Sequence, residues 1–176
     1  VGAGKNKMLI SVKGKPLVWY SLKHVLQSTE LDEIILVTQE KERPEFEEVV
    51  RSFHTQIPFI FANGGRTRSE SVRNGLNRVS AASDKVLIHD GARPLVDGPF
   101  IDSVLNLVNE KVPAVVTGIP CVDTIKKVTP EGMVSMTLDR KELFRAQTPQ
   151  GFYTPLFRKV VDSLSGDEKF TDDVSL

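Results

Sequence analysis

Residues 86–94 read Val86-Leu87-Ile88-His89-Asp90-Gly91-Ala92-Arg93-Pro94. The first three are apolar and have the length of a buried strand, and a charged turn containing glycine follows them directly. In sheets built from alternating strands and helices, ligands bind in the crevice beyond the carboxyl ends of the strands. Asp90 and Arg93 therefore stand where a protein of this class holds a ligand. The carboxylate can bind a metal ion or a hydroxyl group, and the guanidinium can bind a phosphate in bidentate fashion.

A purely structural interpretation of this segment stays open. Asp90 and Arg93 can form an internal ion pair that shapes the turn without any ligand. His89 fits a packed core position better than a catalytic one. The chain has three histidines, and the sequence shows no zinc constellation.

On both sides of this segment, short apolar runs alternate with helical patterns. The apolar runs predict strands at 34–37, 59–61, 86–88 and 114–116. Apolar residues at helical spacing predict helices over 16–26, 44–53 and 69–79, and from an N-cap at Asp97 to Val108. This alternation predicts an α/β fold, Rossmann-like, with a mostly parallel sheet and helices on both faces.

A hairpin interrupts the alternation at about residues 122–140. Alternating residues flank the turn Pro130-Glu131-Gly132, which indicates two antiparallel strands that project from the sheet. An isolated hairpin is only marginally stable, so this one needs a surface to pack on. A second subunit is one such surface and would make the hairpin a dimerisation arm. The hairpin's own domain is the other.

Composition excludes several classes of protein. The 23 Lys and Arg residues balance the 23 Asp and Glu residues, so no overall charge attracts nucleic acid or an anionic membrane. No apolar run approaches the ~20 residues of a membrane helix. Cys121 is the only cysteine, which excludes an intrachain disulfide and favours a reducing compartment. We expect a single domain over residues 1–176 and expect that an N-terminal strand and a C-terminal segment are missing from this stretch.

Two other segments can bind anions. Gly2, Gly4 and Lys7 offer backbone N–H groups and positive charge. Residues 64–71, Gly64-Gly65-Arg66-Thr67-Arg68-Ser69-Glu70-Ser71, join a predicted strand to a predicted helix that Ser69 or Ser71 can cap. Each segment also has a plain structural interpretation. The first can be a turn with a solvated lysine, and the second a capped helix with surface arginines.

Taken together and in this order, these segments resemble the 2-C-methyl-D-erythritol 4-phosphate cytidylyltransferase family over essentially the whole chain. The individual motifs are modest, and their ordered combination is specific. They are Lys7-Met8-Leu9-Ile10, Gly14-Lys15-Pro16-Leu17, Gly64-Gly65-Arg66-Thr67-Arg68 with Ser71-Val72, residues 89–94, Asp123-Thr124-Ile125-Lys126, Thr137-Leu138-Asp139-Arg140, Gln147-Thr148-Pro149-Gln150 and Thr171-Asp172-Asp173.

The resemblance implies a reaction and roles for the matching residues. The phosphate of methylerythritol phosphate would attack the α-phosphorus of CTP, and Mg²⁺ would be held mainly through the CTP phosphates, without a metal site of the protein's own. Lys7 and Arg140 would be catalytic. The nucleotide would be bound by Gly2, Ala3, Gly4, Gly64, Gly65, Arg66, Ser71, Asp90 and Gly91. Methylerythritol phosphate would be bound by Asp90, Arg93, Thr124, Arg140, Thr148 and Thr171.

The resemblance also implies an assembly, and composition bears on partners and compartment. In this family the hairpin arm exchanges between the subunits of a homodimer, so Thr124 and Arg140 would serve the partner's site. No nucleic acid and no membrane is expected as a partner. The expected compartment is the cytoplasm, with a plastid as the alternative if a transit peptide has been removed.

The sequence departs from the family pattern in several places. The loop that ends at Lys7 is shorter than usual and lacks an arginine, Gly91 stands where alanine is usual, and the family's late Asn-Ile-Lys segment is absent. Two alternatives therefore stay open. One is a ribitol-5-phosphate cytidylyltransferase, which shares several motifs but matches residues 123–126 and 137–140 less well. The other is a non-catalytic nucleotide-binding scaffold, against which the retained Lys7, Asp90 and Arg140 argue.

Overall fold

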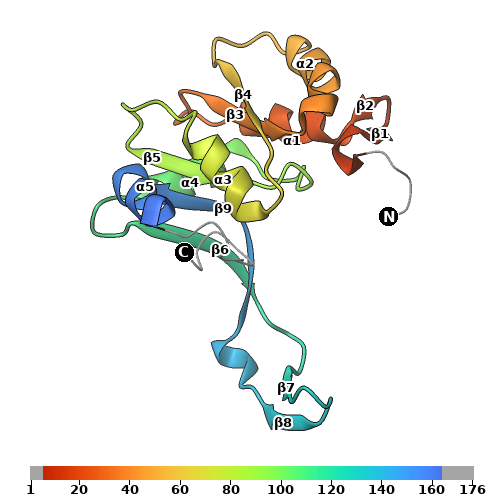
Figure 1. The fold of residues 1–176 in the computed structure, drawn as a ribbon, viewed down its shortest axis with the longest axis vertical. Helices are drawn as coiled ribbons and strands as arrows, with labels where there is room; N and C mark the ends of the chain where they lie inside the picture. The colour runs from red at the N-terminus through yellow and green to blue at the C-terminus, as the bar shows by residue number, and fades with distance from the viewer. Residues whose placement is uncertain (1–5, 164–176) are drawn as a thin grey trace.

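The computed structural model describes residues 6–163 as a mixed α/β fold (Figure 1). Its elements in chain order are η1 (Lys7–Leu9), β1 (Ser11–Val12), β2 (Lys15–Pro16), α1 (Leu17–Val25), β3 (Ile34–Thr38), η2 (Glu40–Glu42), α2 (Arg43–Arg51), β4 (Phe59–Asn63), α3 (Arg68–Leu76), β5 (Lys85–Ile88), α4 (Gly98–Leu107), β6 (Ala114–Pro120), β7 (Lys126–Val128), β8 (Val134–Thr137), η3 (Arg140–Glu142), β9 (Phe144–Tyr153) and α5 (Thr154–Ser163). The strands and helices predicted from periodicity are all present, with boundaries shifted by a few residues.

Strand pairing differs in part from a mostly parallel sheet. β3 and β4 are parallel, with Ile34 opposite Phe59. β9 lies between β5 and β6 and is antiparallel to both. The reason is the arm, because the chain leaves the end of β6 into the hairpin and returns alongside β6 in the opposite direction. The sequence did not predict β9, since Gln147-Thr148-Pro149-Gln150 interrupts it with polar residues and a proline.

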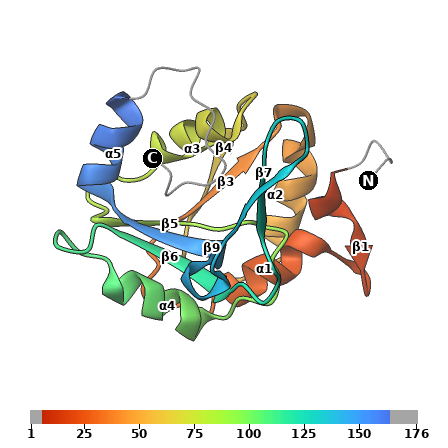
Figure 2. The same ribbon diagram turned by 90° about the horizontal axis from the view of Figure 1, so that it is seen from below.

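Helices cover both faces of the β5–β9–β6 sheet, as the alternation predicts. α4 lies on one face, and α3 and α5 lie on the other (Figures 1 and 2). On the second face Phe152 of β9 stacks on Phe157 of α5, with ring centroids 4.2 Å apart. On the first face a Cβ at Gly151 would lie 2.8 Å from Val108 Cγ2, so the absence of a side chain lets α4 approach β9. Both faces of β9 are therefore fixed by packing.

A cavity of about 570 Å³ separates β3 from β5. Its lining includes all five residues of β3 and all four of β5, together with apolar side chains from α1, α3, α4 and α5. Because successive residues of a strand face opposite sides of a sheet, a lining made of whole strands means that their backbone edges face the cavity. Among residues 6–163, β3 pairs only with β4 and β5 pairs only with β9. The β-structure is thus divided into two sheets at this cavity.

The hairpin predicted at about 122–140 is confirmed. β7 and β8 pair antiparallel, with Lys126 opposite Thr137, and Gly132 in the turn has a φ of 84°. The hairpin projects away from the body of the molecule (Figure 1), and every residue of β7 and β8 is exposed. It therefore does not fold back onto its own domain. None of the described helices is long and apolar enough to cross a membrane.

The two neighbouring positions Leu156 and Phe157 of α5 test the packing of this helix. Phe157 is 5% exposed and belongs to the core, whereas Leu156 is 44% exposed. Phe157→Ala should lower the free energy of unfolding by about 3–5 kcal/mol through lost burial and a residual cavity. Leu156→Ala, the matched control, should cost about 1 kcal/mol or less. Urea unfolding followed by circular dichroism measures both, and equal losses would contradict the assigned orientation of α5.

Candidate active site

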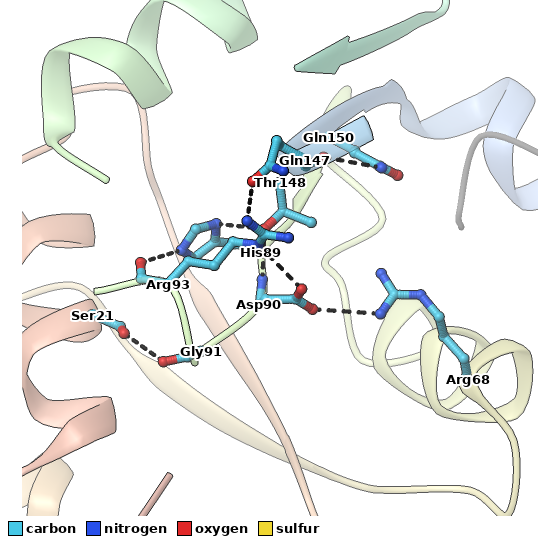
Figure 3. Close-up of polar contacts among 9 residues, drawn as sticks. All are labelled: Ser21, Arg68, His89, Asp90, Gly91, Arg93, Gln147, Thr148 and Gln150. Carbon is cyan, nitrogen blue, oxygen red and sulfur yellow. Dashed lines mark hydrogen bonds and ion pairs between the residues drawn. The ribbon is translucent and has the colours of Figure 1, made fainter. Parts of the chain in front are cut away.

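Two loops far apart in sequence meet at the end of β5. Ile88, the last residue of β5, lies opposite Gln150 of β9, so the residues after Ile88 run beside those that precede Gln150. As a result the backbone N–H of Asp90 donates a hydrogen bond of 3.1 Å to Thr148 Oγ1 (Figure 3). The Thr148–Pro149 peptide bond is cis. The pairing of β5 with β9 thus joins two segments that the sequence predicted to bind ligands.

The Asp90 carboxylate lies between two arginines (Figure 3). Arg68 Nη1 is 3.4 Å from Oδ1, and Arg93 Nε is 3.4 Å from Oδ2. The internal ion pair of Asp90 with Arg93, which the sequence left open, is therefore present. All three side chains are about 40% exposed, so solvent screens the pairs and each contributes little to stability. The two guanidinium groups therefore flank the Asp90 carboxylate in a partly solvated site.

Arg93 is also held by a second partner. Its Nη1 donates to Oε1 of Gln147, the residue before Thr148. A shallow pocket opens beside this pair, and its lining consists of Ala92, Arg93, Pro94, Leu95, Val96, Asp97, Phe100, Gln147 and Thr148. The lining combines the Arg93 guanidinium, the Thr148 hydroxyl and apolar side chains with the carboxylate of Asp97, which caps α4. The first three suit a small phosphorylated alcohol.

His89 belongs to this polar cluster rather than to the apolar core. Its Nε2 lies 3.1 Å from the carbonyl oxygen of Arg93, and its Nδ1 lies 3.2 Å from Thr148 Oγ1 (Figure 3). The sequence favoured a packed core histidine, and the structure corrects this, because two polar partners occupy both ring nitrogens. Burial lowers the pKa of His89, while the Arg93 carbonyl and the charge of Asp90 offset part of that effect. Its neutral form is favoured at neutral pH.

The glycine pair 64–65 joins β4 to α3 in a tight turn. The N–H of Gly64 donates to the carbonyl of Thr38, and the N–H of Gly65 donates to Ser71 Oγ. A Cβ at Gly65 would lie 2.3 Å from Glu70 Cγ, so only glycine fits beside that side chain. The turn therefore has backbone without side chains at the carboxyl ends of β3 and β4.

Capping of α3 differs from the expectation. Thr67, and neither Ser69 nor Ser71, is the N-cap, and its side chain accepts from the N–H of Glu70. Glu70 in turn accepts from the N–H of Arg66 at 2.7 Å. The Arg66 side chain is exposed. Thr67 and Glu70 thus cap the start of α3 from within the chain, and the Arg66 side chain beside it lies at the surface.

Gly91 brings a third element to the site. Ser21 of α1 donates to the carbonyl of Gly91, and a Cβ at Gly91 would lie 3.0 Å from Met8 Sδ. Met8 belongs to η1, the short helix that also carries Lys7. Glycine in place of the family's usual alanine therefore leaves room for the Met8 side chain. The Lys7 side chain itself is exposed.

The other predicted residues lie elsewhere. Gly2, Ala3, Gly4 and Thr171 fall outside the described residues. Thr124 and Arg140 are exposed on the arm, where Arg140 Nη1 donates to the carbonyl of Val122 at 3.0 Å. Gly64, Ser71, Asp90 and Gly91 line one cavity, and Gly65 bonds to Ser71. Arg93 and Thr148 contact Asp90 from the other side. Among residues 6–163, the structure gives no contact of the Arg66 or Lys7 side chain with this group, and both side chains are exposed.

Residues that were not among the predicted site residues also contribute. Arg68 and Gln147 hold Asp90 and Arg93, and Ser21 holds Gly91. Both Arg68 and Gln147 lie within motifs of the sequence analysis, so their polar character could be predicted. Their partners could not, because Asp90 and Arg93 belong to another loop. Within residues 6–163, no group of three or more His, Cys, Asp or Glu side chains could hold a metal ion.

Comparison with known proteins assigns the family. The family model for 2-C-methyl-D-erythritol 4-phosphate cytidylyltransferase matches residues 1–176. A protein of that name from Prochlorococcus marinus is 39% identical over 175 residues, which cover 99% of this chain and 77% of the relative. One from Bacillus mycoides is 40% identical over 156 residues, which cover 89% of this chain and 68% of the relative.

Solved structures agree with the sequence comparison. The 4-diphosphocytidyl-2C-methyl-D-erythritol synthase of Anaerococcus prevotii superimposes with a TM-score of 0.87 at 28% identity, over 96% of this chain and 76% of that one. The 2-C-methyl-D-erythritol 4-phosphate cytidylyltransferase of Thermus thermophilus superimposes with a TM-score of 0.73 at 26% identity, over 98% and 78%. This chain belongs to the 2-C-methyl-D-erythritol 4-phosphate cytidylyltransferase family.

Proposed function

We propose that this chain transfers a cytidylyl group from CTP to 2-C-methyl-D-erythritol 4-phosphate, giving 4-diphosphocytidyl-2-C-methyl-D-erythritol and pyrophosphate, a step of isoprenoid biosynthesis. The observation that carries the proposal is the meeting of Asp90, Arg93 and Thr148 at the end of β5, beside the Gly64–Gly65 turn. The glycine turn and the shallow pocket beside Arg93 and Thr148 thus lie on either side of Asp90, at the carboxyl ends of the strands, where α/β proteins bind ligands. Family membership supplies the identity of the two substrates.

The reaction is an in-line displacement at the α-phosphorus of CTP. An oxygen of the 4-phosphate forms the new P–O bond, while the bond to the β-phosphate breaks and its electron pair leaves with pyrophosphate. The attacking oxygen is already ionised, so no general base is required. The protein's task is to position two polyanions and to neutralise charge in the transition state. Lys7 and Arg140 are assigned to charge neutralisation, and Gly64, Gly65, Arg66 and Ser71 to the cytosine and ribose.

Mg²⁺ fits this scheme as an ion carried mainly on the phosphates of CTP, where it would neutralise negative charge. The Asp90 carboxylate is engaged by two guanidinium groups, which makes it a poor metal ligand of the protein's own. Asp90 and Gly91 are assigned to the nucleotide ribose and the sugar alcohol. Arg93 and Thr148 are assigned to methylerythritol phosphate, as is Thr171, which lies outside the described residues.

A homodimer that exchanges the arm completes the proposed site. The arm carries unpartnered apolar side chains, including Val128, Met133, Val134 and Met136, which are 52–68% exposed. A second subunit is the surface that would bury them. Thr124 and Arg140 would then reach the partner's methylerythritol phosphate, because they lie on the arm and not beside Asp90 of their own chain.

We further propose that a single domain spans this chain and that an extended strand fills the cavity between β3 and β5. Asn6 and Met8 line that cavity, and among the described residues β3 and β5 present their free backbone edges to it. Such a strand would pair with both free edges and join the two sheets into one. For the compartment we propose the cytoplasm, since the lone Cys121 forms no intrachain disulfide.

The assigned substrate can be tested directly. The protein is incubated with CTP, Mg²⁺ and either methylerythritol phosphate or ribitol 5-phosphate, and pyrophosphate release is followed. We expect release with methylerythritol phosphate. Release with ribitol 5-phosphate alone would identify the chain as a ribitol-5-phosphate cytidylyltransferase instead. Release with neither substrate would favour a non-catalytic nucleotide-binding scaffold.

Arg140 provides a test of the charge assignment. Arg140→Ala should lower kcat/KM for methylerythritol phosphate tenfold or more, on the order expected for loss of a charged phosphate contact. Lys141→Ala removes a neighbouring exposed cation and serves as the matched control, with kinetics close to wild type. Unchanged kinetics in Arg140→Ala would contradict its role.

Subunit exchange can be tested by complementation. Lys7→Ala and Arg140→Ala are each expected to be impaired, and a heterodimer of the two is purified through two different tags. If Arg140 serves the partner's site, one site of that heterodimer holds both cations, and about half of wild-type activity returns. A heterodimer no more active than its parents would place Lys7 and Arg140 of one chain in the same site.

A further inference from the structure

The hydrogen bonds around His89 have a fixed direction. A carbonyl oxygen only accepts, so the contact between Nε2 and the Arg93 carbonyl requires that Nε2 carries the hydrogen. In the neutral ring Nδ1 then has a lone pair and accepts. The hydroxyl of Thr148 is 3.2 Å from Nδ1 and must be the donor of that bond. His89 therefore dictates where the hydroxyl hydrogen of Thr148 points.

The direction of the bond from Thr148 to His89 determines which hydrogen bonds Thr148 Oγ1 can still make. A hydroxyl oxygen has one hydrogen and two lone pairs. The hydrogen points to His89, and one lone pair receives the backbone N–H of Asp90 at 3.1 Å. One lone pair remains, and Thr148 lines the shallow pocket beside Arg93. Toward that pocket Thr148 can only accept a hydrogen bond.

We propose that His89 is a positioning residue that holds the Thr148 hydroxyl as an acceptor, so that Thr148 binds a hydroxyl group of the sugar alcohol and not its phosphate. The inference rests on the proposed function. It assigns a hydroxyl group of the substrate to Thr148 and the substrate phosphate to Arg93. An ionised phosphate offers only acceptor oxygens and finds no donor at Thr148. The guanidinium of Arg93, on the same pocket, supplies the donors that a phosphate needs.

Protonation of His89 reverses this polarity. An imidazolium has hydrogens on both nitrogens, so Nδ1 would donate to Thr148 Oγ1 and the hydroxyl hydrogen would turn toward the pocket. The charged groups that act on the ring are the Asp90 carboxylate, which favours protonation, and the Arg93 guanidinium, which opposes it. Burial is the largest influence and lowers the pKa of His89 below the ordinary value of 6.5. The acceptor state therefore persists at neutral pH.

The first test examines the ring in the free protein and does not depend on any activity. Long-range ¹H–¹⁵N NMR distinguishes the Nε2–H tautomer, the Nδ1–H tautomer and the imidazolium. The signals of His89 are assigned by their loss in His89→Asn, since the chain has three histidines. We expect the neutral Nε2–H form at pH 7.5. The Nδ1–H form or an imidazolium at that pH would overturn the inference.

The second test uses a matched pair of variants. In His89→Asn the side-chain oxygen can take the place of Nδ1 and accept from Thr148, whereas in His89→Gln the amide can take the place of Nε2 and lose that acceptor. We expect KM for methylerythritol phosphate to rise about five- to tenfold in His89→Gln and less in His89→Asn, with KM for CTP unchanged in both. Equal effects in the two variants, or an effect on CTP alone, would overturn the inference.

The third test identifies the group that Thr148 binds. Thr148→Val and wild type are compared on methylerythritol phosphate and on analogues that each lack one hydroxyl group. For one analogue the penalty of Thr148→Val should vanish, because its partner is already absent. An undiminished penalty with every analogue would mean that Thr148 contacts the phosphate and would overturn the inference. Absence of wild-type turnover would instead count against the proposed function, and the NMR result would then decide the role of His89.

Discussion

The pairing of β5 with β9 is the constraint on which the candidate site depends. Its register places Ile88 opposite Gln150, and so brings Thr148 beside Asp90, 58 residues earlier in the chain. Packing on both faces of β9 maintains that register, through Phe152 on one face and Gly151 on the other. A slip of one residue would turn Phe152 to the other face of the sheet, away from Phe157. The packing of the core and the contacts of the site therefore require the same register.

Charge in the site is arranged around one carboxylate. Asp90 pairs with Arg68 from α3 and with Arg93 from its own loop, where two phosphorylated substrates are proposed to meet. Because these pairs are partly exposed, solvent weakens them, so they orient the arginines while contributing little to stability. The neutral composition of the whole chain is thus compatible with arginines gathered at one site.

Local patterns predicted most of the elements but not the strand that organises them. Apolar runs and helical spacing predicted β3, β4, β5, the start of β6 and the first four α-helices, and the side chain of Asp97 caps α4 as expected. β9 lacks such a signal, because its middle residues are polar and include a proline, and Gln147 and Thr148 among them contact the site. α5, which covers β9, was missed with it. His89 was assigned to the core for a related reason, since no local signal points to its partner Thr148.

By itself the sequence determined which residues carry chemistry and where each stands on its own element. The motifs around Gly64, Asp90 and Thr148, and their resemblance to a family, follow from residue order alone. Tertiary structure decided which of them meet: Asp90 with Arg68 and Thr148, but not with Thr124 or Arg140, which lie on the projecting arm. The physical reason is that hydrogen bonds and ion pairs depend on distances of a few ångströms, and these are set by strand register and packing between residues remote in sequence.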